Sequence, residues 1–486
     1  MKKTYKWAAV LSAAAVISMG SAVMAMAATG WSSEGDSWIY LDSSGNKVTN
    51  EWKKSGDQSY YLGSDGYIVT DSWVDDAYYV DEDGVLLKSQ WIYMEDGQES
   101  PSGEEEGWFY LSSTGKAVTD GWELIDGKYY CFDDDGRMYT GWHFDDDYVY
   151  YLGEDGSRKT GWVCLEYDED DEPEEGDIGT AESAGDDAKW FYFQSSGKMV
   201  AADSDSSYVL KSINGSKYYF DENGVMLTGW AAIEDEAETG DSTGISKFKY
   251  FGGDNDGAMA KGWKYLTEHP TDSDDSEEMT TGSTDKPEDG EGYWYYFDTD
   301  GTPKYLSSTA ATVSSAVGKV GSTSYFFDEY GCMQTGLIGL DFDGTVYAAY
   351  FGTSEDDAAM RTGKQTSVYD GNDEKGTYYF NTSGSDKGGG YTGVKDDYLY
   401  YEGKLVKADA DSDFQVFEVN GKFYLVNESG KVQTSAKYYQ VDGEYTYQYS
   451  GGTIYVVDDD KEILHEVSES DCAAMEEVVY DSYYSF

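Results

Sequence analysis

The sequence predicts an all-β fold: an elongated solenoid of stacked β-hairpin repeats of about 20 residues each, interrupted by acidic loop insertions. Aromatic side chains make up 16% of the 486 residues, and there are only 5 prolines. Disordered acidic chains are poor in aromatic residues, so most of this chain is expected to fold. Short aromatic runs alternate with turns rich in Asp, Asn, Ser and Gly, which is the pattern of β-hairpins. The turn glycines recur regularly, for example at Gly45, Gly66 and Gly84.

One frame aligns successive segments of the chain. It is clear in WIYLDSSGNKVTNEW from Trp38, in YYCFDDDGRMYTGW from Tyr129 and in YYFDENGVMLTGW from Tyr218. Each copy has a short aromatic strand, a turn that ends in Gly, and a second short strand that returns to Thr-Gly-Trp or a variant of it. A lone hairpin of this length is not stable in water, so each unit is expected to cover the apolar face of its neighbour.

The predicted organisation follows these repeats along the chain. A basic start, an apolar run and the small residues from Ala25 to Ala27 indicate a secretory signal peptide. Inserts rich in Glu, Asp, Ser, Thr and Gly separate blocks of repeats and are expected to be solvated loops. In order, we expect a signal peptide (1–27), repeats (28–167), an acidic insert (168–188), repeats (189–267), a second acidic insert (268–292), divergent repeats (293–435) and a degenerate C-terminal unit (436–486), with shorter inserts at 95–107 and 235–244.

The charge of the chain excludes several classes of partner. There are 95 acidic and 34 basic residues, which gives a formal net charge of −61. This charge repels a phosphate backbone, so no nucleic-acid binding is expected. No stretch after the signal peptide approaches the ~18 apolar residues of a membrane span, so no membrane insertion is expected either. The mature protein is expected to be secreted and very acidic.

Residue types that carry catalysis are scarce. Cys131, Cys164, Cys332 and Cys472 form no CxxC pair, and one disulfide among them stays open. The three histidines are isolated in the sequence, and neither HExxH nor GxSxG occurs, so we expect neither a zinc site nor a catalytic triad. Cys472 and His465 are the one candidate nucleophile pair, and no recognisable motif surrounds them. We expect no catalytic residues, no metal site and no cofactor, with loosely bound Ca²⁺ on the acidic inserts as the open alternative.

The repeat frame resembles the cell-wall-binding repeats of Gram-positive surface proteins. These include the choline-binding repeats of autolysins and adhesins and the related glucan-binding and toxin-type repeats. The resemblance covers roughly residues 28–435, and its repetition makes it more specific than any single copy. It implies stacked hairpins that attach an exported protein to a wall or surface polymer. The closest matches are Thr140-Gly141-Trp142, Thr160-Gly161-Trp162 and Thr228-Gly229-Trp230, with Met138, Met226, Met259 and Met333 at the expected Met position.

In the choline-binding branch of this family, a cage of aromatic rings holds the quaternary ammonium of the ligand. The cage combines the Trp of Gly-Trp, the Trp of the Trp-Tyr-Tyr run and a Tyr from the next unit, and each ring face contributes about 0.5 to 2 kcal/mol. Carried over to this sequence, the intact set is Trp31 with Trp38, followed by Tyr60 or Tyr61. The resemblance therefore places the best choline cage at the first repeat.

The other repeats keep only parts of this pattern. Trp108, Trp190 and Trp294 each follow an insertion that separates them from the preceding Gly-Trp tryptophan, so these cages are expected to be incomplete. Aromatic stripes in repeat proteins are commonly packing, so a structural role is the alternative for each ring. The candidate ligand-binding residues are Trp31, Trp38, Tyr60, Tyr61, Trp108, Trp122, Trp142, Trp162, Trp190, Trp230, Trp263 and Trp294.

The expected function is that of a non-catalytic exported surface protein. Its aromatic repeats would bind a cell-wall or surface polysaccharide or a teichoic-acid-type polymer, through choline or through the faces of sugars, and would hold the protein at the wall non-covalently. Two alternatives stay open. The chain could be an autolysin-like wall hydrolase that uses its repeats for targeting, or a host-adhesion or matrix protein with a different partner. Ligand identity and oligomeric state are not fixed by the sequence.

Overall fold

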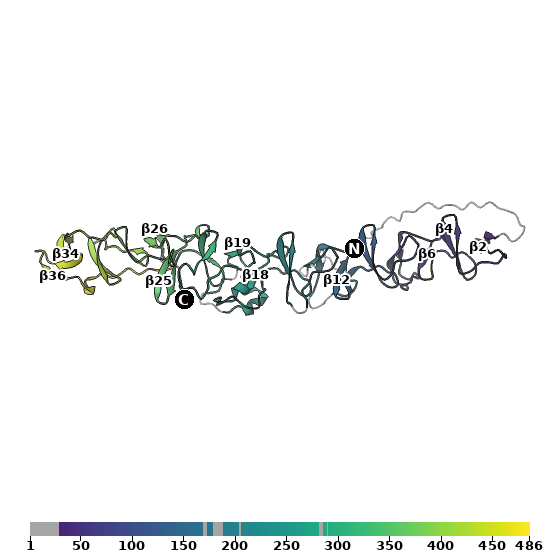
Figure 1. Cartoon of the computed structure of the whole chain (residues 1–486), viewed down its shortest axis with the longest axis horizontal. Helices are drawn as coiled ribbons and strands as arrows, with labels where there is room; N and C mark the ends of the chain where they lie inside the picture. The colour runs from purple at the N-terminus through teal and green to yellow at the C-terminus, as the bar shows by residue number, and fades with distance from the viewer. Residues whose placement is uncertain (1–28, 169–172, 178–187, 204–205, 281–284, 289) are drawn as a thin grey trace. The chain divides into compact units, whose positions relative to one another are not determined.

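The computed structural model describes residues 29–168, 173–177, 188–203, 206–280, 285–288 and 290–486 (Figure 1). The predicted signal peptide, residues 1–27, lies outside the described residues, as does most of the insert 168–188. The chain divides into two compact units, which are Met1–Ala188 with Phe193–Met199, and Lys189–Tyr192 with Val200–Phe486. Within the described ranges, no helix is long and apolar enough to cross a membrane.

The all-β prediction is confirmed, because regular structure in the first unit consists of short antiparallel hairpins. In strands such as β7, the buried Ile92 and Met94 alternate with more exposed residues, which gives the hairpin one apolar face. The hairpins of the first unit pair β1 (Gly30–Glu34) with β2 (Ser37–Leu41), β3 (Glu51–Ser55) with β4 (Gln58–Leu62), β5 (Ser72–Val74) with β6 (Tyr78–Val80), β7 (Gln90–Met94) with β8 (Gly107–Leu111), β9 (Gly121–Ile125) with β10 (Lys128–Phe132), and β11 (Gly141–Asp145) with β12 (Tyr148–Leu152). Strand β13 (Gly161–Glu166) follows, and β14 (Ala188–Phe193) is divided between the units, with Lys189–Tyr192 in the second.

The second unit begins with similar hairpins and continues into larger sheets. Its two-stranded pairs are β15 (Val209–Ile213) with β16 (Ser216–Phe220), β17 (Trp230–Ala232) with β18 (Phe248–Tyr250), β19 (Gly262–Leu266) with β20 (Tyr293–Phe297), and β31 (Phe414–Val419) with β32 (Lys422–Asn427). One three-stranded sheet contains β21 (Gly318–Val320), β22 (Thr323–Phe327) and β23 (Met333–Gln334), and another contains β24 (Leu337–Phe342), β25 (Thr345–Tyr350) and β37 (Ser482–Ser485). A five-stranded sheet contains β26 (Gly363–Tyr369), β27 (Lys375–Phe380), β28 (Gly393–Lys395), β29 (Tyr398–Tyr401) and β30 (Lys404–Leu405). A four-stranded sheet contains β33 (Lys437–Val441), β34 (Glu444–Ser450), β35 (Thr453–Val457) and β36 (Ile463–Glu466).

The hairpins stack through one recurring backbone hydrogen bond. The residue two positions after the turn glycine is called the return position here, and in many repeats it donates its N–H to the preceding hairpin. In the first unit, Met138 donates to the carbonyl of Trp108 at 2.8 Å, and Ile68 donates to that of Trp38 at 3.0 Å. In the second unit, Met226 donates to Trp190 at 2.9 Å. The predicted stacking of neighbouring repeats is therefore confirmed within each unit.

The acidic turn residues stabilise the hairpin ends by accepting hydrogen bonds from backbone N–H groups. Asp133 accepts the N–H of Arg137 on its carboxylate at 2.6 Å, and its carbonyl accepts the N–H of Gly136 at 3.1 Å. Gly136 has a φ of 90°, which is in the left-handed region that favours glycine. Asp221 makes the same carboxylate contact to Val225 at 2.7 Å. These contacts explain why Asp and Gly recur together in the repeat frame.

The C-terminal segment 467–486 runs back over the repeats, and we call it the C-terminal strap. Ala473 donates its N–H to the carbonyl of Val416 at 2.8 Å, and Val479 accepts the N–H of Gly371 at 3.0 Å. The strap ends in β37, which pairs in parallel with β24. The C-terminus accordingly lies beside β25 and not beyond β36 (Figure 1). The predicted degenerate unit 436–486 is thus a four-stranded sheet, β33 to β36, followed by a returning strap.

The acidic insert 268–292 is a packed element, so the expectation of a solvated loop is wrong for it. It contains the short 3-10 helices η3 (Pro270–Asp272) and η4 (Asp274–Glu278). His269 is fully buried, its Nδ1 accepts a hydrogen bond from the Tyr295 hydroxyl at 2.8 Å, and its Nε2–H donates to the carbonyl of Glu291 at 2.8 Å. The Cys332 thiol donates to the Tyr295 oxygen at 3.1 Å. His269, Tyr295 and Cys332 thus form one hydrogen-bonded network, which fixes the insert to the core.

Candidate ligand-binding sites

Three rings from two neighbouring hairpins of the first unit form an aromatic cage, which we call cage A. Trp91 lies on β7, Trp108 on the paired strand β8, and Tyr130 on β10 of the next hairpin. The centroids of Trp91 and Trp108 are 6.5 Å apart with an interplanar angle of 85°, and Tyr130 lies 4.8 Å from Trp91 at 63°. Trp108 is 36% exposed. Two nearly perpendicular tryptophans thus meet a third ring, and solvent reaches the group through Trp108.

The second unit contains the same arrangement, which we call cage B. Trp263 on β19 and Trp294 on β20 have centroids 6.3 Å apart at 84°. Tyr325, on β22 of the next repeat, lies 4.9 Å from Trp263 at 76°. The agreement of the two cages in distance and angle shows that one repeat geometry builds both.

Cages A and B correct the expectation that the inserts break the pattern. The insert 95–107 is the loop of the hairpin β7–β8, and the insert 268–292 is the loop of the hairpin β19–β20. Both hairpins keep unbroken antiparallel registers, with Trp91 opposite Tyr110 and Trp263 opposite Tyr296. In these two hairpins the long loops leave the tryptophans of the paired strands in reach of each other. Trp91, Tyr130 and Tyr325 are therefore functional candidates that the sequence reasoning missed.

A carboxylate lies at the rim of each cage. The Tyr93 hydroxyl donates to Glu106 Oε2 at 2.6 Å, and the Tyr93 ring packs on Trp108 with centroids 5.0 Å apart. This hydrogen bond to Glu106 raises the pKa of Tyr93 to about 12. In cage B, the indole Nε1–H of Trp294 donates to Glu355 Oε2 at 3.1 Å. Negative charge beside an aromatic cage favours a cationic ligand over an anionic one.

The first repeat does not close into the cage that its spacing predicts. Trp31 packs edge-on against Tyr40 and against Tyr60, with both centroids 5.3 Å away. Trp38 stands opposite Ser33 in the hairpin, and no ring contact between Trp38 and Trp31 occurs in the described part of the chain. Tyr60 is 3% exposed and belongs to the core. The intact seven-residue spacing therefore gives a less complete cage than the interrupted pairs do.

Two of the predicted ligand residues are enclosed by acidic inserts. Trp142 is 2% exposed, and its backbone N–H donates to the carbonyl of Asp177 at 2.9 Å. Trp230 is 6% exposed, and its Nε1–H donates to the carbonyl of Glu268 at 3.0 Å. Trp230 also belongs to a core cluster with Tyr295 and other buried rings. Both tryptophans therefore have a packing role, which was the structural alternative.

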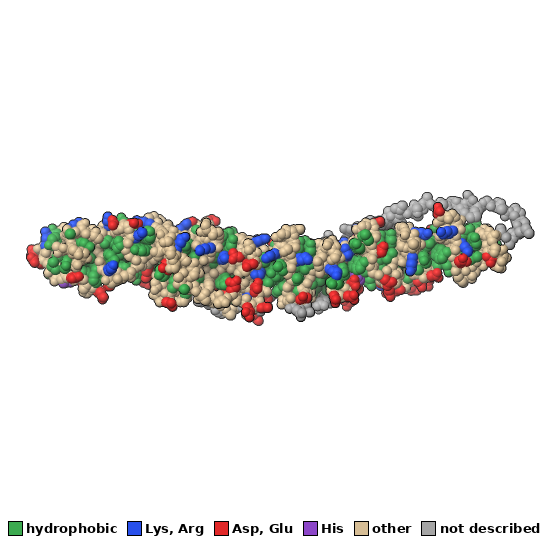
Figure 2. Space-filling view, viewed as in Figure 1, with side chains coloured by type: hydrophobic (Ala, Val, Ile, Leu, Met, Phe, Trp, Pro, Cys, Tyr) green, Lys and Arg blue, Asp and Glu red, His purple; other side chains and the backbone are tan. Residues whose placement is uncertain are grey.

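The remaining predicted residues have individual surroundings. Tyr61 packs on Trp52 with centroids 5.2 Å apart. Trp122 packs on Tyr150 with centroids 4.8 Å apart, and Trp162 is half-buried. The Nε1–H of Trp190 donates to Asn255 Oδ1 at 2.9 Å. Figure 2 shows apolar side chains in green reaching the surface along the repeats of each unit, with red carboxylates at the lower margin of the view.

The structure places one cysteine beside a histidine, but the thiol is not activated. The Cys131 thiol lies 3.4 Å from His143 Nε2, and His143 Nδ1 lies 2.6 Å from Glu175 Oε1. Burial raises the pKa of Cys131 to about 12, so the thiol is neutral at neutral pH and is a poor nucleophile. Glu175 also accepts the N–H of Phe144 at 2.9 Å. The chain of contacts anchors the insert residues 173–177 to β11.

The other thiols are not poised for chemistry either. All four cysteines are free in the structure. The Cys472 thiol donates weakly to the carbonyl of Ser468 at 3.6 Å, whereas His465 Nε2 contacts Asp471 at 3.0 Å. The candidate nucleophile pair of Cys472 and His465 is therefore not joined by a contact in the described residues. Among those residues, no group of three or more His, Cys, Asp or Glu side chains is arranged to hold a metal ion.

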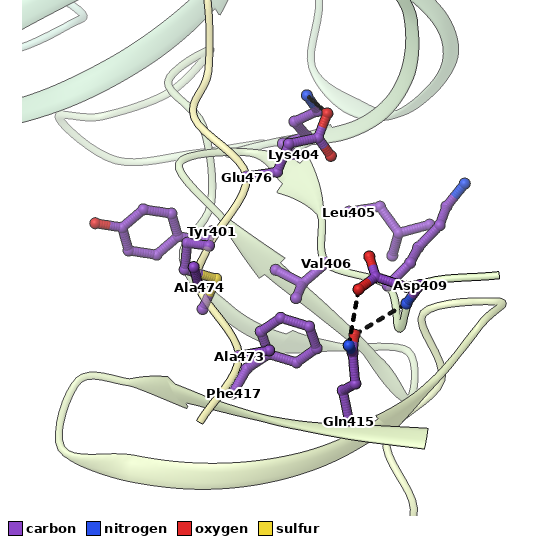
Figure 3. Close-up of a pocket in the computed structure, with 12 residues that line it drawn as sticks. Tyr401, Lys404, Leu405, Val406, Asp409, Gln415, Phe417, Ala473, Ala474 and Glu476 are labelled. Carbon is purple, nitrogen blue, oxygen red and sulfur yellow. Dashed lines mark hydrogen bonds and ion pairs between the residues drawn. The ribbon is translucent and has the colours of Figure 1, made fainter. Parts of the chain in front are cut away.

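A pocket of about 340 Å³ lies between the C-terminal strap and the strands β29 to β31 (Figure 3). Three of its charged groups, Lys404, Glu476 and Asp409, already have partners among the lining residues. The Lys404 ammonium lies 2.6 Å from Glu476 on the strap, and the Gln415 amide donates to Asp409 at 2.8 Å (Figure 3). The pocket thus marks where the strap docks and offers few free polar groups to a ligand.

Models of known repeat families match the hairpins that build these sites. The choline-binding repeat matches residues 47–86 and 118–162. The cell wall binding repeat matches residues 29–47, 186–199, 210–226 and 288–302. The chain therefore carries cell-wall-binding repeats in these segments. The matched segments of this repeat protein include Trp122 and Tyr130 in the first unit and Trp294 in the second.

Individual proteins are similar to parts of this chain. Glucosyltransferase-S of Streptococcus mutans is 27% identical over 259 residues, which are 52% of this chain and 14% of that protein. The chain therefore spans a small part of the length of this curated relative. Choline binding protein F of Streptococcus pneumoniae, solved with a peptidoglycan analogue, is 23% identical with a TM-score of 0.36 over 71% of this chain and 98% of that one. The modular autolysin LytC of the same species is 20% identical with a TM-score of 0.35, over 64% of this chain and 55% of that chain.

Proposed function

We propose that cages A and B bind quaternary ammonium groups of the choline type on a cell-wall polymer, and that the protein is a secreted, non-catalytic wall-attachment protein. The observation that carries the proposal is the pair of perpendicular tryptophans, closed by a tyrosine of the next repeat, that occurs in both units. A quaternary ammonium cannot donate hydrogen bonds, so aromatic faces are its best partners, at about 0.5 to 2 kcal/mol per face. Attachment would be non-covalent.

The charge of the chain restricts how such a polymer is recognised. A formal net charge of −61 opposes the approach of a polyanionic polymer such as a teichoic acid. At physiological salt this repulsion is screened beyond about 8 Å, so recognition must be short-ranged. Cationic head groups that enter a cage beside Glu106 or Glu355 meet this requirement. Because cages A and B lie on one chain, binding of the polymer at one cage would raise its effective concentration at the other, so the overall avidity would exceed the affinity of either cage.

A second candidate ligand is the face of a neutral sugar. Tyr93 is 40% exposed and extends the Trp108 wall, and Tyr265 is 51% exposed and packs on Trp294 with centroids 5.4 Å apart. Exposed aromatic pairs of this kind present flat surfaces that suit the apolar face of a sugar ring. This reading also fits attachment without catalysis, and it differs from the first in needing no cation.

Retention on purified walls tests the proposed function. The protein should bind choline-bearing walls and be released by free choline, whereas a glucan or a chelator should not release it. Release by glucan alone would favour the sugar reading, and release by a chelator would show that divalent cations bridge the surfaces. Incubation with peptidoglycan should liberate neither reducing sugar nor free amino groups, and liberation of either by hydrolase-free protein would refute the non-catalytic part of the proposal.

The variant Trp108→Ala combined with Trp294→Ala removes one wall from each cage. Its retention on choline-bearing walls should fall, because each cage loses one cation–π face. Trp52→Ala is the matched control. Trp52 holds the same repeat position as Trp91 and packs on Tyr78 with centroids 5.5 Å apart, but Ser59 replaces the second tryptophan. Equal loss in the control would indicate a stability effect and not a ligand effect.

A further inference from the structure

A third set of rings in the first unit has the layout of a cage, and we call it cage C. Trp122 lies on β9, Tyr129 on the paired strand β10, and Tyr150 on β12 of the next hairpin. Tyr129 stands opposite Leu124, two residues beyond Trp122, just as Trp108 stands opposite Tyr93, two residues beyond Trp91. Trp122 and Tyr150 have centroids 4.8 Å apart at 54°. Cage C therefore has a tyrosine where cage A has its second tryptophan.

A side chain of the protein itself occupies cage C. The guanidinium carbon of Arg158 lies 4.3 Å from the ring centroid of Tyr129 and 5.6 Å from that of Trp122. These distances are within the range of cation–π contacts. Arg158 holds the return position of its repeat, where its backbone N–H donates to the carbonyl of Tyr129 at 2.9 Å. Its place over the rings is thus set by the same type of hydrogen bond that Met138 makes to Trp108 beside cage A.

The return position distinguishes cage C from cages A and B. Met138 holds it beside cage A, where it packs in a cluster with Trp91 and Tyr130. Met333 holds it beside cage B, in a cluster with Trp263 and Trp294. Methionine lines a cage without carrying charge, whereas arginine brings a permanent cation into it.

The polar contacts of Arg158 are few. Nη2 donates to the carbonyl of Ser195 at 3.3 Å, and Nε is buried without a hydrogen-bond partner. The nearby carboxylates are engaged elsewhere, since Asp145 accepts the indole N–H of Trp122 at 3.4 Å and Asp155 pairs with Lys128 at 2.9 Å. No ion pair of the described residues includes Arg158. The rings of cage C are therefore the main partners of this guanidinium.

We propose that cage C is a latent quaternary-ammonium site that Arg158 keeps occupied from within. This inference rests on the proposed function of cages A and B. An internal cation pays no cost of lost translational freedom, so it outcompetes a free head group of similar intrinsic affinity. Arg158 thereby limits the number of ligands that the first unit binds.

The variant Arg158→Met, which installs the residue of cages A and B, tests the proposal. Titration with choline should show one more binding site than the wild-type chain shows, with an affinity within about tenfold of cage A. Lys159→Met removes a neighbouring charge that faces none of these rings and should leave the number of sites unchanged. Adding Tyr129→Ala to Arg158→Met should abolish the extra site. A folded Arg158→Met chain without an extra site would overturn the proposal.

The same titration separates this inference from the proposed function. In the background of Trp108→Ala with Trp294→Ala, Arg158→Met should still gain one site, whichever way cages A and B behave. Wild-type binding without a gain in Arg158→Met refutes only the latent site, and a gain without binding at cages A and B refutes only the proposed function. A ligand-free readout covers the case in which Arg158→Met fails to fold. The Arg158 Nε–H resonance should carry a ring-current shift that Tyr129→Ala removes, and an unshifted resonance would contradict the occupied cage.

Discussion

Replacement of Tyr484 by Ala tests whether the C-terminal strap is part of the folded second unit. Tyr484 is 6% exposed, it stands opposite Leu340 in the parallel pair of β37 and β24, and its ring packs on Phe326 with centroids 4.9 Å apart. Truncation of a buried aromatic side chain to Ala costs about 3 to 5 kcal/mol. We expect the free energy of unfolding of the second unit to fall by about that amount.

Tyr483 offers a matched control on the same strand. It is 48% exposed on the other face of β37, and its hydroxyl donates to Asp341 at 3.0 Å. Tyr483→Ala should cost about 1 kcal/mol or less, the usual worth of an exposed hydrogen bond. Denaturant titration gives the free energies, and limited proteolysis should release the strap only in Tyr484→Ala. Equal losses in both variants, or no loss in either, would refute the strap as a packed element.

Three further predictions concern the cages and the buried polar groups. Trp91→Ala should weaken choline binding at cage A by about 1 to 2 kcal/mol, roughly 5- to 30-fold, in calorimetric titration, while Trp52→Ala should leave it unchanged. Burial raises the pKa of Asp328 from 3.8 to about 7, so between these pH values the folded state holds a proton that the unfolded chain releases. The free energy of unfolding should therefore fall as the pH rises from about 4 to about 7. Asp328→Asn should flatten the pH dependence of the denaturation midpoint. His269→Ala should cost about 1 to 3 kcal/mol in denaturant titration, because it leaves the buried Tyr295 hydroxyl without its acceptor, and an unchanged midpoint would show that the insert is not anchored there.

The repeating hairpin was predictable from sequence because its signals are local. Aromatic runs and Asp-Gly turns specify each hairpin within about 20 residues, and neighbouring hairpins have the same sequence pattern. Cages A and B were not predictable from spacing along the chain, because strand pairing brings Trp91 and Trp108 together across the insert 95–107. The repeat frame did hold one usable signal for cage C, since Arg158 replaces the apolar residue found at most return positions.

The strap and the packed inserts depend on contacts between distant residues. The sequence of Ser482–Ser485 predicts a short strand, but it does not predict that this strand pairs with β24. His269 is isolated in the sequence, and its burial depends on Tyr295 and on the carbonyl of Glu291. The acidic composition of the inserts predicts exposed carboxylates, but it does not show that a few buried residues, such as His269, pack an insert against the core.

Calorimetric titration of the folded chain with choline is the most direct test of the central claim, that paired tryptophans in cages A and B each hold one quaternary ammonium. At a choline concentration that just saturates the wild-type chain, the number of occupied sites should fall by about one in Trp108→Ala, by about one in Trp294→Ala and by about two in the double variant, because each cage loses one cation–π face, with circular dichroism unchanged. Absence of binding heat in the wild-type chain, or a number of sites that neither substitution changes, would contradict the account.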